Sequence, residues 1–149
     1  MKFWLDESIC DKMPTRNDGE DAGFDFYLPE DTEFKSGCWT KINSGICSKF
    51  DSNIALIAQN KSGIAQMGLI VGACVVDSSY EGNIHLHLYN TTPLDIYIEK
   101  GKKIVQFVPF YIDPTKAEMF KSSDISKEDF YEGSTSTRGD GGFGSTQIK

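Results

Sequence analysis

Apolar and polar residues alternate along much of the chain with a period of two, which predicts β-strands. Residues 24–28 and 84–89 alternate strictly, so each stretch is expected to bury one face and expose the other. Further strands are predicted where short apolar runs are bounded by turn residues: Ile54–Ala58, Ala73–Val76, Ile96–Ile98 and Ile104–Val108. Many short strands at this spacing predict an all-β fold, a barrel of the jelly-roll kind.

Helical signal is weak and confined to two places. One is a short turn around residues 64–69, and the other begins at Ser126, which can cap a turn through Asp129 three residues on. After the last predicted strand the apolar rhythm lapses, and serine, threonine and glycine dominate. We therefore divide a single domain into three parts: a β-barrel core over residues 1–112, a polar tether over 113–137 and a glycine-rich arm over 138–149.

The composition limits the classes of protein and partner. A length of 149 residues with 39% hydrophobic residues suits one globular domain. The apolar runs are shorter than the roughly 20 residues of a membrane-spanning helix, and the first residues do not resemble a signal peptide, so we expect a cytoplasmic protein. The net charge of −7 disfavours duplex nucleic acid, because phosphate-backbone binding needs a basic face. The four widely spaced cysteines indicate reduced thiols rather than a zinc site.

His85 and His87 share one face of a predicted strand, which is also how a metal site in a β-barrel begins. The sequence places no acidic or thiol partner beside them, and two ligands do not fill a coordination shell. A structural or interface role is therefore favoured for this pair.

Five short stretches concentrate glycine, charge and hydroxyl groups. In chain order they are Ala22–Phe26 (AGFDF), Lys61–Ala65 (KSGIA), Val71–Gly82 (VGACVVDSSYEG), Gly101–Gln106 (GKKIVQ) and Arg138–Thr146 (RGDGGFGST). The last stretch also has the spacing of a dinucleotide-binding turn, but no room remains for the helix that such a turn needs. Together the five resemble the ordered motifs of the homotrimeric dUTPase family, and the resemblance spans most of the chain. It implies a distorted jelly-roll-like β-barrel with a flexible C-terminal arm, assembled as a trimer whose sites are shared between subunits.

The third stretch carries most of the expected chemistry. Val75 and Val76 are expected to end a buried strand, after which the residues around Tyr80 turn the chain back as a hairpin and hold Asp77 in place. A rigidly held carboxylate can act as a general base toward water, although an aspartate at such a position often only closes its turn. The resemblance implies that Asp77 activates the attacking water and holds the 3′-hydroxyl, while Tyr80 packs under the deoxyribose.

Main-chain groups of this hairpin recognise uracil in the family. The resemblance therefore assigns substrate contacts to Cys74, Val75 and Val76. Cys74 stands where the family usually has glycine, and we expect it to be a small buried apolar side chain rather than a catalytic thiol.

The resemblance assigns the triphosphate to the second and fourth stretches and a metal ion to the first. Lys61 and Ser62 would donate to phosphate oxygens, and Gly63 would open the short helix behind them. Lys61 replaces the usual arginine, so it keeps the charge but loses the two-pronged grip of a guanidinium. Gln106 would lie near the phosphates and the attacking water. Asp25 would hold Mg²⁺ through water, which suits an ion that gives up its waters reluctantly.

The last stretch is expected to act as a lid over the bound nucleotide. Its expected ligand contacts are Arg138, Gly142, Phe143, Gly144, Ser145 and Thr146. The aromatic ring can cover the base, the arginine and hydroxyls can reach phosphate oxygens, and the glycines let the main chain lie close to a flat ligand. Closure of such a lid expels water from the site.

The expected activity is hydrolysis of dUTP to dUMP and pyrophosphate by attack of water on the α-phosphorus, which limits uracil in DNA and supplies dUMP. Expected partners are dUTP, Mg²⁺ and two further copies of the chain, with no direct contact to duplex nucleic acid or a membrane. One alternative is a nucleotide-responsive regulatory binding protein on the same scaffold, with the polar tether as its docking segment. A dCTP deaminase is disfavoured because Asp77 and Tyr80 follow the dUTPase pattern.

Overall fold

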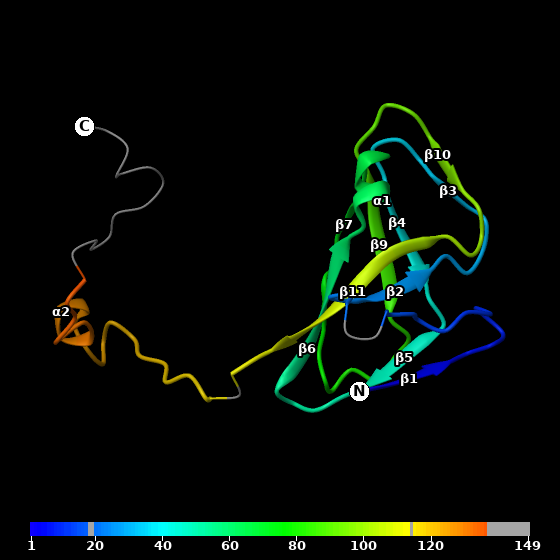
Figure 1. Ribbon diagram of the computed structural model, residues 1–149. Coiled ribbons are helices and arrows are strands. Elements are labelled where there is room, and N and C mark those ends of the chain that lie inside the picture. The colour runs from blue at the N-terminus through cyan, green and yellow to red at the C-terminus, as the bar shows by residue number, and fades with distance from the viewer. Residues whose placement is uncertain (18–19, 114, 137–149) are drawn as a thin grey trace. The chain divides into compact units, whose positions relative to one another are not determined.

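The computed structural model describes residues 1–17, 20–113 and 115–136. The chain divides into two units, Met1–Pro114 and Thr115–Lys149. The regular structure described in the first unit is mostly strands, with one short helix, and the described part of the second contains another short helix (Figure 1). None of the helices in the described ranges is long and apolar enough to cross a membrane.

The strands of the first unit form four small antiparallel sheets. The elements of the described chain are β1 (Lys2–Leu5), β2 (Phe24–Tyr27), β3 (Thr32–Phe34), β4 (Trp39–Asn43), β5 (Ile46–Lys49), β6 (Ile54–Asn60), α1 (Ser62–Gln66), β7 (Leu69–Val71), β8 (Val75–Val76), β9 (His85–Asn90), β10 (Ile96–Ile98), β11 (Lys103–Tyr111) and, in the second unit, α2 (Lys127–Phe130). Their order is β1-β5, β10-β3, β2-β11-β6-β8 and β4-β9-β7. The all-β fold predicted from the alternation is confirmed.

The four-stranded sheet organises the residues of interest. β11 pairs with β6 along most of its length and with β2 near its start, so Gln106 lies opposite Asp25 on one side and Gln59 on the other. β8 pairs with the other edge of β6, where Val76 lies opposite Leu56. Figure 1 shows β11 running beside both β6 and β2.

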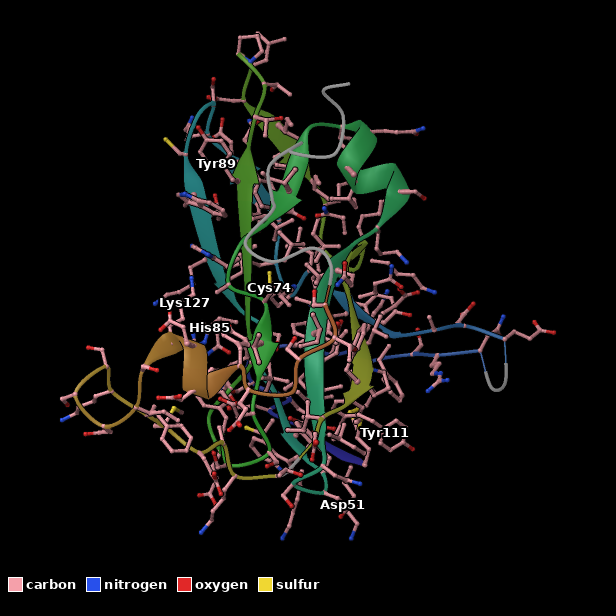
Figure 2. The ribbon with its side chains drawn as sticks, turned by 90° about the vertical axis from the view of Figure 1, so that its left-hand side faces the viewer. Asp51, Cys74, His85, Tyr89, Tyr111 and Lys127 are labelled. Carbon is pink, nitrogen blue, oxygen red and sulfur yellow. The ribbon has the colours of Figure 1, made fainter. Side chains whose placement is uncertain are left out.

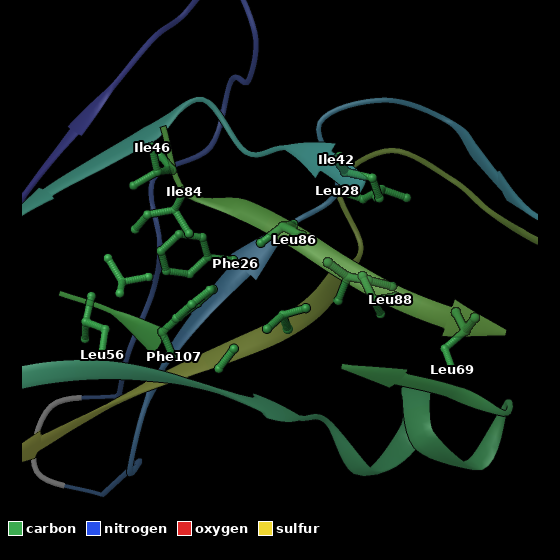
Figure 3. Packing of buried hydrophobic residues seen from close by; sticks show 14 of the residues in the cluster. Phe26, Leu28, Ile42, Ile46, Leu56, Leu69, Ile84, Leu86, Leu88 and Phe107 are labelled. Atoms are coloured by element: carbon green, nitrogen blue, oxygen red, sulfur yellow. The ribbon is translucent and has the colours of Figure 1, made fainter. Parts of the chain in front are cut away.

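The core lies between the four-stranded sheet and the β4-β9-β7 sheet. Its largest fully buried side chains come from both sheets and the strands beside them: Phe26, Leu28, Phe34, Ile46, Leu56, Leu69, Ile84, Leu86, Leu88, Ile104, Val105 and Phe107. Figure 3 shows Phe26 and Phe107 facing Leu86 across this space, and the two phenyl centroids are 4.6 Å apart. Burying each such side chain contributes about 1.5–3 kcal/mol to the free energy of folding. The apolar positions of an alternating strand therefore determine which of its faces is turned to the core.

The connection after β8 differs from the predicted hairpin. β8 pairs with β6, whereas β9 pairs with β4 and β7, so the two strands belong to different sheets. The predicted strand over residues 73–76 is also shorter, because only Val75 and Val76 join the ladder with β6. Residues 77–84, called the Asp77 loop below, therefore cross from one sheet to the other instead of closing a hairpin.

Other boundaries also depart from the predicted ones. The predicted turn over residues 64–69 is the helix α1, which begins at Ser62, and Leu69 already belongs to β7. The predicted strand from Ile104 extends to Tyr111, because β6 provides a partner for every residue from Val105 onward. Strands β3, β4, β5 and β7 were not predicted, since each is short and its inward positions are few.

The second unit contains a local structure inside the segment predicted to be a polar tether. Ser126 caps α2 as predicted, with its Oγ accepting a hydrogen bond from the Asp129 N–H at 3.0 Å. The rings of Phe120, Phe130 and Tyr131 pack edge to face, with centroids 5.9 Å and 5.0 Å apart in succession. The sequence pattern did not indicate this aromatic cluster, because its members follow no strand or helix period.

Candidate functional site

Asp25 on β2 is paired with two lysines from neighbouring elements. Lys61 Nζ lies 2.5 Å from Asp25 Oδ1, and Lys103 Nζ lies 2.9 Å from Oδ2. The carboxylate is enclosed, with 12% of the side chain exposed, whereas the side chains of Lys61 and Lys103 are 26% and 48% exposed. The three residues form a group, called the Asp25 cluster below, in which the cations rather than the anion are open to a ligand.

The electrostatics of the Asp25 cluster favour an anionic ligand. Burial alone raises the pKa of Asp25, but hydrogen bonds and attraction from Lys61 and Lys103 outweigh it and hold the pKa below its ordinary value of 3.8. The Asp25 carboxylate in turn raises the pKa of Lys103 above 10.5. At neutral pH the cluster therefore holds one negative and two positive charges, which leaves a positive charge for a phosphate.

Gln106 lies directly beside this cluster. It is opposite Asp25 in the β2–β11 register, and its Nε2 donates a hydrogen bond to the main-chain oxygen of Asn60 at 3.1 Å. Asn60 ends β6, and Lys61 is the N-cap of α1, whose first residues are Ser62 and Gly63. The structure thus brings together the predicted residues of the first, second and fourth motifs.

Lys103 is a member of the cluster that sequence reasoning missed. It lies three positions before Gln106, so simple alternation would place the two side chains on opposite faces of β11. The register shifts between Lys103 and Val105, and Ile104 and Val105 are both fully buried. This bulge places the Lys103 side chain on the same face of β11 as Gln106. In the sequence, the only indication of the bulge was the pair of adjacent apolar residues between Lys103 and Gln106.

Asp77 lies on the rim of a separate pocket of about 210 Å³. The pocket is lined by Ala73, Val75, Val76, Asp77, Tyr80, Ile84, His85 and Phe107. The Asp77 loop is held by the Tyr80 Oη, which donates to the Asn83 oxygen at 3.0 Å, and by the Ile84 N–H, which donates to the Ile46 oxygen at 2.7 Å. The Asp77 carboxylate is exposed and has no hydrogen-bond partner among the described residues, so it is available to a ligand.

Cys74 lies just before the pocket-lining residues of β8. Its thiol donates to the Gly72 oxygen, and its own main-chain oxygen accepts a hydrogen bond from the Ala58 N–H at 2.7 Å. The side chain is half-buried and packs against the core. All four cysteines are free. Figure 2 shows Cys74 beside β9, along which His85 and Tyr89 lie.

Asp77 and the Asp25 cluster lie toward opposite ends of β6. Val76 is opposite Leu56, and the antiparallel register carries Asp77 further away from the end of β6 at Asn60. Five residue steps separate Leu56 from Lys61, which corresponds to roughly 16 Å at about 3.3 Å per residue. One chain therefore holds the predicted general base and the predicted phosphate-binding lysine well apart.

Six predicted ligand contacts belong to the glycine-rich arm. They are Arg138, Gly142, Phe143, Gly144, Ser145 and Thr146, and they lie outside the described residues. Their assignment stays a prediction.

The exposed lysines of the Asp25 cluster form a cationic site at one end of a central strand of this antiparallel fold, which suits an anionic ligand. The sequence matches the dUTPase family profile over residues 11–147. The chain belongs to the dUTPase family.

Individual relatives agree with this assignment. The chain is 30% identical over 135 residues to the deoxyuridine 5′-triphosphate nucleotidohydrolase of Debaryomyces hansenii, covering 90% of this chain and 79% of that protein. It is 32% identical over 137 residues to the protein of the same name from Paramecium bursaria Chlorella virus 1, covering 91% and 89%.

Solved structures share the fold. A variant of the Staphylococcus bacteriophage 80alpha dUTPase, solved with dUpNHpp, superposes with a TM-score of 0.80 at 20% identity and covers 99% of this chain and 98% of that one. A variant of the dUTPase of phage phi11 of S. aureus, described with a structural Mg(II) ion, has a TM-score of 0.72 at 17% identity and covers 80% and 95%. These likenesses establish the dUTPase fold.

Proposed function

We propose that this chain is a dUTP diphosphatase that hydrolyses dUTP to dUMP and pyrophosphate. The observation that carries the proposal is the Asp25 cluster with Gln106 beside it, a preformed anion site at the positions that match the family's phosphate-binding motifs. The reaction limits uracil incorporation into DNA and supplies dUMP.

Asp77 takes the role of general base in this proposal. It accepts a proton from a water molecule while the water oxygen attacks the α-phosphorus and the bond to pyrophosphate breaks. Main-chain groups at Cys74, Val75 and Val76 bind the uracil edge, and Tyr80 lies under the sugar. The support is positional, since Val75, Val76, Asp77 and Tyr80 line one pocket.

The triphosphate is bound by the cationic end of the barrel. Lys61 and Lys103 reach solvent while their partner Asp25 is enclosed, so each can turn its ammonium group to a phosphate oxygen as nucleotide arrives. Ser62 and the amides near Gly63 add donors. Gln106, held by the Asn60 oxygen, orients the attacking water.

Magnesium fits this chain as part of the substrate. Among the described residues no group of three or more His, Cys, Asp or Glu side chains could hold a metal ion, and both Asp25 oxygens face ammonium groups. Mg²⁺ prefers phosphate oxygens and gives up its waters reluctantly, so it would enter with dUTP, and Asp25 is the residue that would hold it through water. The ion would supply positive charge that neutralises the triphosphate.

The active site is shared between subunits of a homotrimer. The separation of Asp77 from Lys61 along β6 supports this, because one nucleotide must reach both residues. Asp77 of one subunit then faces the Asp25 cluster of a neighbour, and the arm over residues 138–149 closes over the nucleotide.

The activity is tested by measuring pyrophosphate release from dUTP, dTTP, dCTP and UTP with Mg²⁺ present. We expect turnover of dUTP, with UTP excluded by Tyr80 and dTTP by the close main chain near Val75. A chain that binds dUTP without releasing pyrophosphate would be a regulatory binding protein. Ammonia release from dCTP would instead identify a deaminase.

The shared site is tested by mixing two inactive full-length variants, Asp77→Asn and Lys61→Gln. Each is refolded alone, shown to be trimeric and then co-refolded with the other. If base and phosphate site come from different chains, random assembly restores about a quarter of the sites, each with one intact Asp77 and one intact Lys61. A mixture as inactive as its parents would place both residues in the same chain's site.

A further inference from the structure

His87 on β9 is a half-buried histidine whose ring is covered by an aromatic side chain. The neighbouring Leu86 and Leu88 point into the core, so His87 faces the opposite side of the sheet. Trp39 on the paired strand β4 stacks on the imidazole, with ring centroids 4.6 Å apart and an interplanar angle of 14°. The stack holds the imidazole in a single orientation.

This oriented imidazole binds the segment that leads to the Asp77 pocket. The Gly72 N–H donates to the His87 main-chain oxygen at 2.7 Å, and the Ala73 N–H donates to His87 Nδ1 at 3.3 Å. Main chain and side chain of one residue thus bind two successive amides. His87 Nδ1 therefore acts as a hydrogen-bond acceptor for the main chain.

Gly72 lies too close to the stacked rings to carry a side chain. A Cβ at this position would overlap the Trp39 ring and lie 2.6 Å from His87 Nδ1. The backbone angle at Gly72 is open to any residue, so the requirement is for space. Glycine therefore lets the main chain come within hydrogen-bonding reach of the imidazole.

The bound segment continues directly into the wall of the pocket. Two residues after Ala73, Val75 pairs with Ile57 on β6, and the Cys74 oxygen accepts from the Ala58 N–H. Residues 72–76 are thus stretched between β9 at one end and β6 at the other. Moving the β9 end would shift the main chain that lines the pocket ahead of Asp77.

We propose that His87 is a positioning residue for uracil recognition. Its imidazole, stacked on Trp39, and its main-chain oxygen fix Gly72 and Ala73 and so set the main chain of residues 73–77 against the base. The inference rests on the proposed hydrolysis of dUTP and adds a specificity-determining residue outside the five motifs.

Three substitutions at His87 separate its hydrogen bond from its bulk. His87→Asn places an amide oxygen where Nδ1 lies and keeps the acceptor, whereas His87→Leu removes it and His87→Gln moves it outward. Tyr89→Leu is a matched control on the same face of β9, because Tyr89 also contacts Trp39, with centroids 5.0 Å apart, but makes no bond to residues 72–73.

The first readout is steady-state kinetics of the full-length trimer with dUTP and dTTP. For His87→Leu and His87→Gln we expect KM for dUTP to rise about tenfold with kcat within about twofold, and the preference over dTTP to fall. His87→Asn and Tyr89→Leu should stay close to the unmodified chain. If His87 only stabilised the fold, the His87→Leu and His87→Gln variants would have a lower unfolding temperature but no rise in KM at nearly constant kcat. That result would overturn the proposal.

The second readout is hydrogen exchange of the Ala73 amide in the ligand-free protein. We expect faster exchange in His87→Leu and protection in His87→Asn, whereas equal protection in both would overturn the proposal. The two proposals fail separately. An unmodified chain without dUTP hydrolysis contradicts the function, whereas an active chain whose His87→Leu variant keeps KM and specificity contradicts the positioning role.

Discussion

Asp25 is an acidic residue at an enclosed position of a β-sheet, and its neighbours explain why it is tolerated there. An unpaired buried carboxylate would be costly, but both oxygens of Asp25 are within hydrogen-bonding distance of an ammonium group. The enclosed carboxylate pairs with both lysines and holds their ammonium groups where they are exposed to solvent. Structure and binding therefore depend on the same three side chains.

Replacement of Asp25 by asparagine should destabilise the fold in a pH-dependent way. We expect Asp25→Asn to lower the free energy of unfolding at pH 7 by about 1–2 kcal/mol, since the lysines lose a charged partner. The pKa of Asp25 is lower in the folded than in the unfolded chain. Its stabilising contribution is therefore complete above about pH 5 and is lost as pH falls through the folded-state pKa.

Urea unfolding of both proteins from pH 7 to pH 2 measures this difference. The exposed pair of Asp11 and Lys100, 3.1 Å apart, provides a control, because solvent screens it and Asp11→Asn should change stability less. If the difference in unfolding free energy between the unmodified chain and Asp25→Asn stays constant down to pH 2, the charge of Asp25 does not contribute to stability.

Unlike the enclosed and paired carboxylate of Asp25, the Asp77 carboxylate is exposed and has no hydrogen-bond partner among the described residues. We expect Asp77→Asn to keep its unfolding temperature and its affinity for a non-hydrolysable dUTP analogue, because the side chain is nearly isosteric. Its kcat should fall about 10²- to 10⁴-fold for want of a general base. Near-normal kcat in the purified variant would exclude Asp77 as the base.

At the scale of elements, the packing of β2 against β11 determines where the functional side chains lie. Gly23 is buried immediately before β2, and a Cβ there would lie 2.9 Å from both the Phe107 oxygen and Val108 Cγ2. The two strands can approach only because this position has no side chain. The bulge in β11 lies in the same pairing.

We expect Gly23→Ala to lower the free energy of unfolding by about 1–3 kcal/mol, because the added methyl group forces the strands apart. Gly63→Ala is the matched control, since a Cβ at Gly63 would meet nothing within 4 Å and alanine favours the helix α1 by up to about 1 kcal/mol. Chemical unfolding of both variants measures the difference. Equal stabilities would show that β2 can shift to accept the methyl group.

At the scale of the whole molecule, the separation of Asp77 from the Asp25 cluster supports the proposed sharing of the active site between subunits. In that proposal a monomer holds Asp77 and the Asp25 cluster but no complete active site. We therefore expect specific activity to fall on dilution in parallel with the fraction of trimer. Sedimentation and pyrophosphate release over the same concentration range measure this, and full activity in a sample shown to be monomeric would contradict a shared site.

The sequence by itself determined the strands with strict alternation and the order of the motifs. Residues 24–28 and 84–89 were predicted with the correct inward faces, because burial of every second side chain is a local pattern. Motif order likewise indicated the dUTPase family, which the family profile confirms. The candidate residues Asp25, Lys61 and Gln106 were named from sequence, although their mutual contacts were not.

Only the tertiary structure decided which residues meet. Lys103 reaches Asp25 through a bulge, Val76 pairs with β6 instead of β9, and His87 binds the amide of Ala73. Each contact joins segments far apart in the chain, so it depends on strand register, and a shift of one residue would turn every side chain to the other face. Local patterns specify which face of a strand is buried, whereas packing of the whole barrel selects the register.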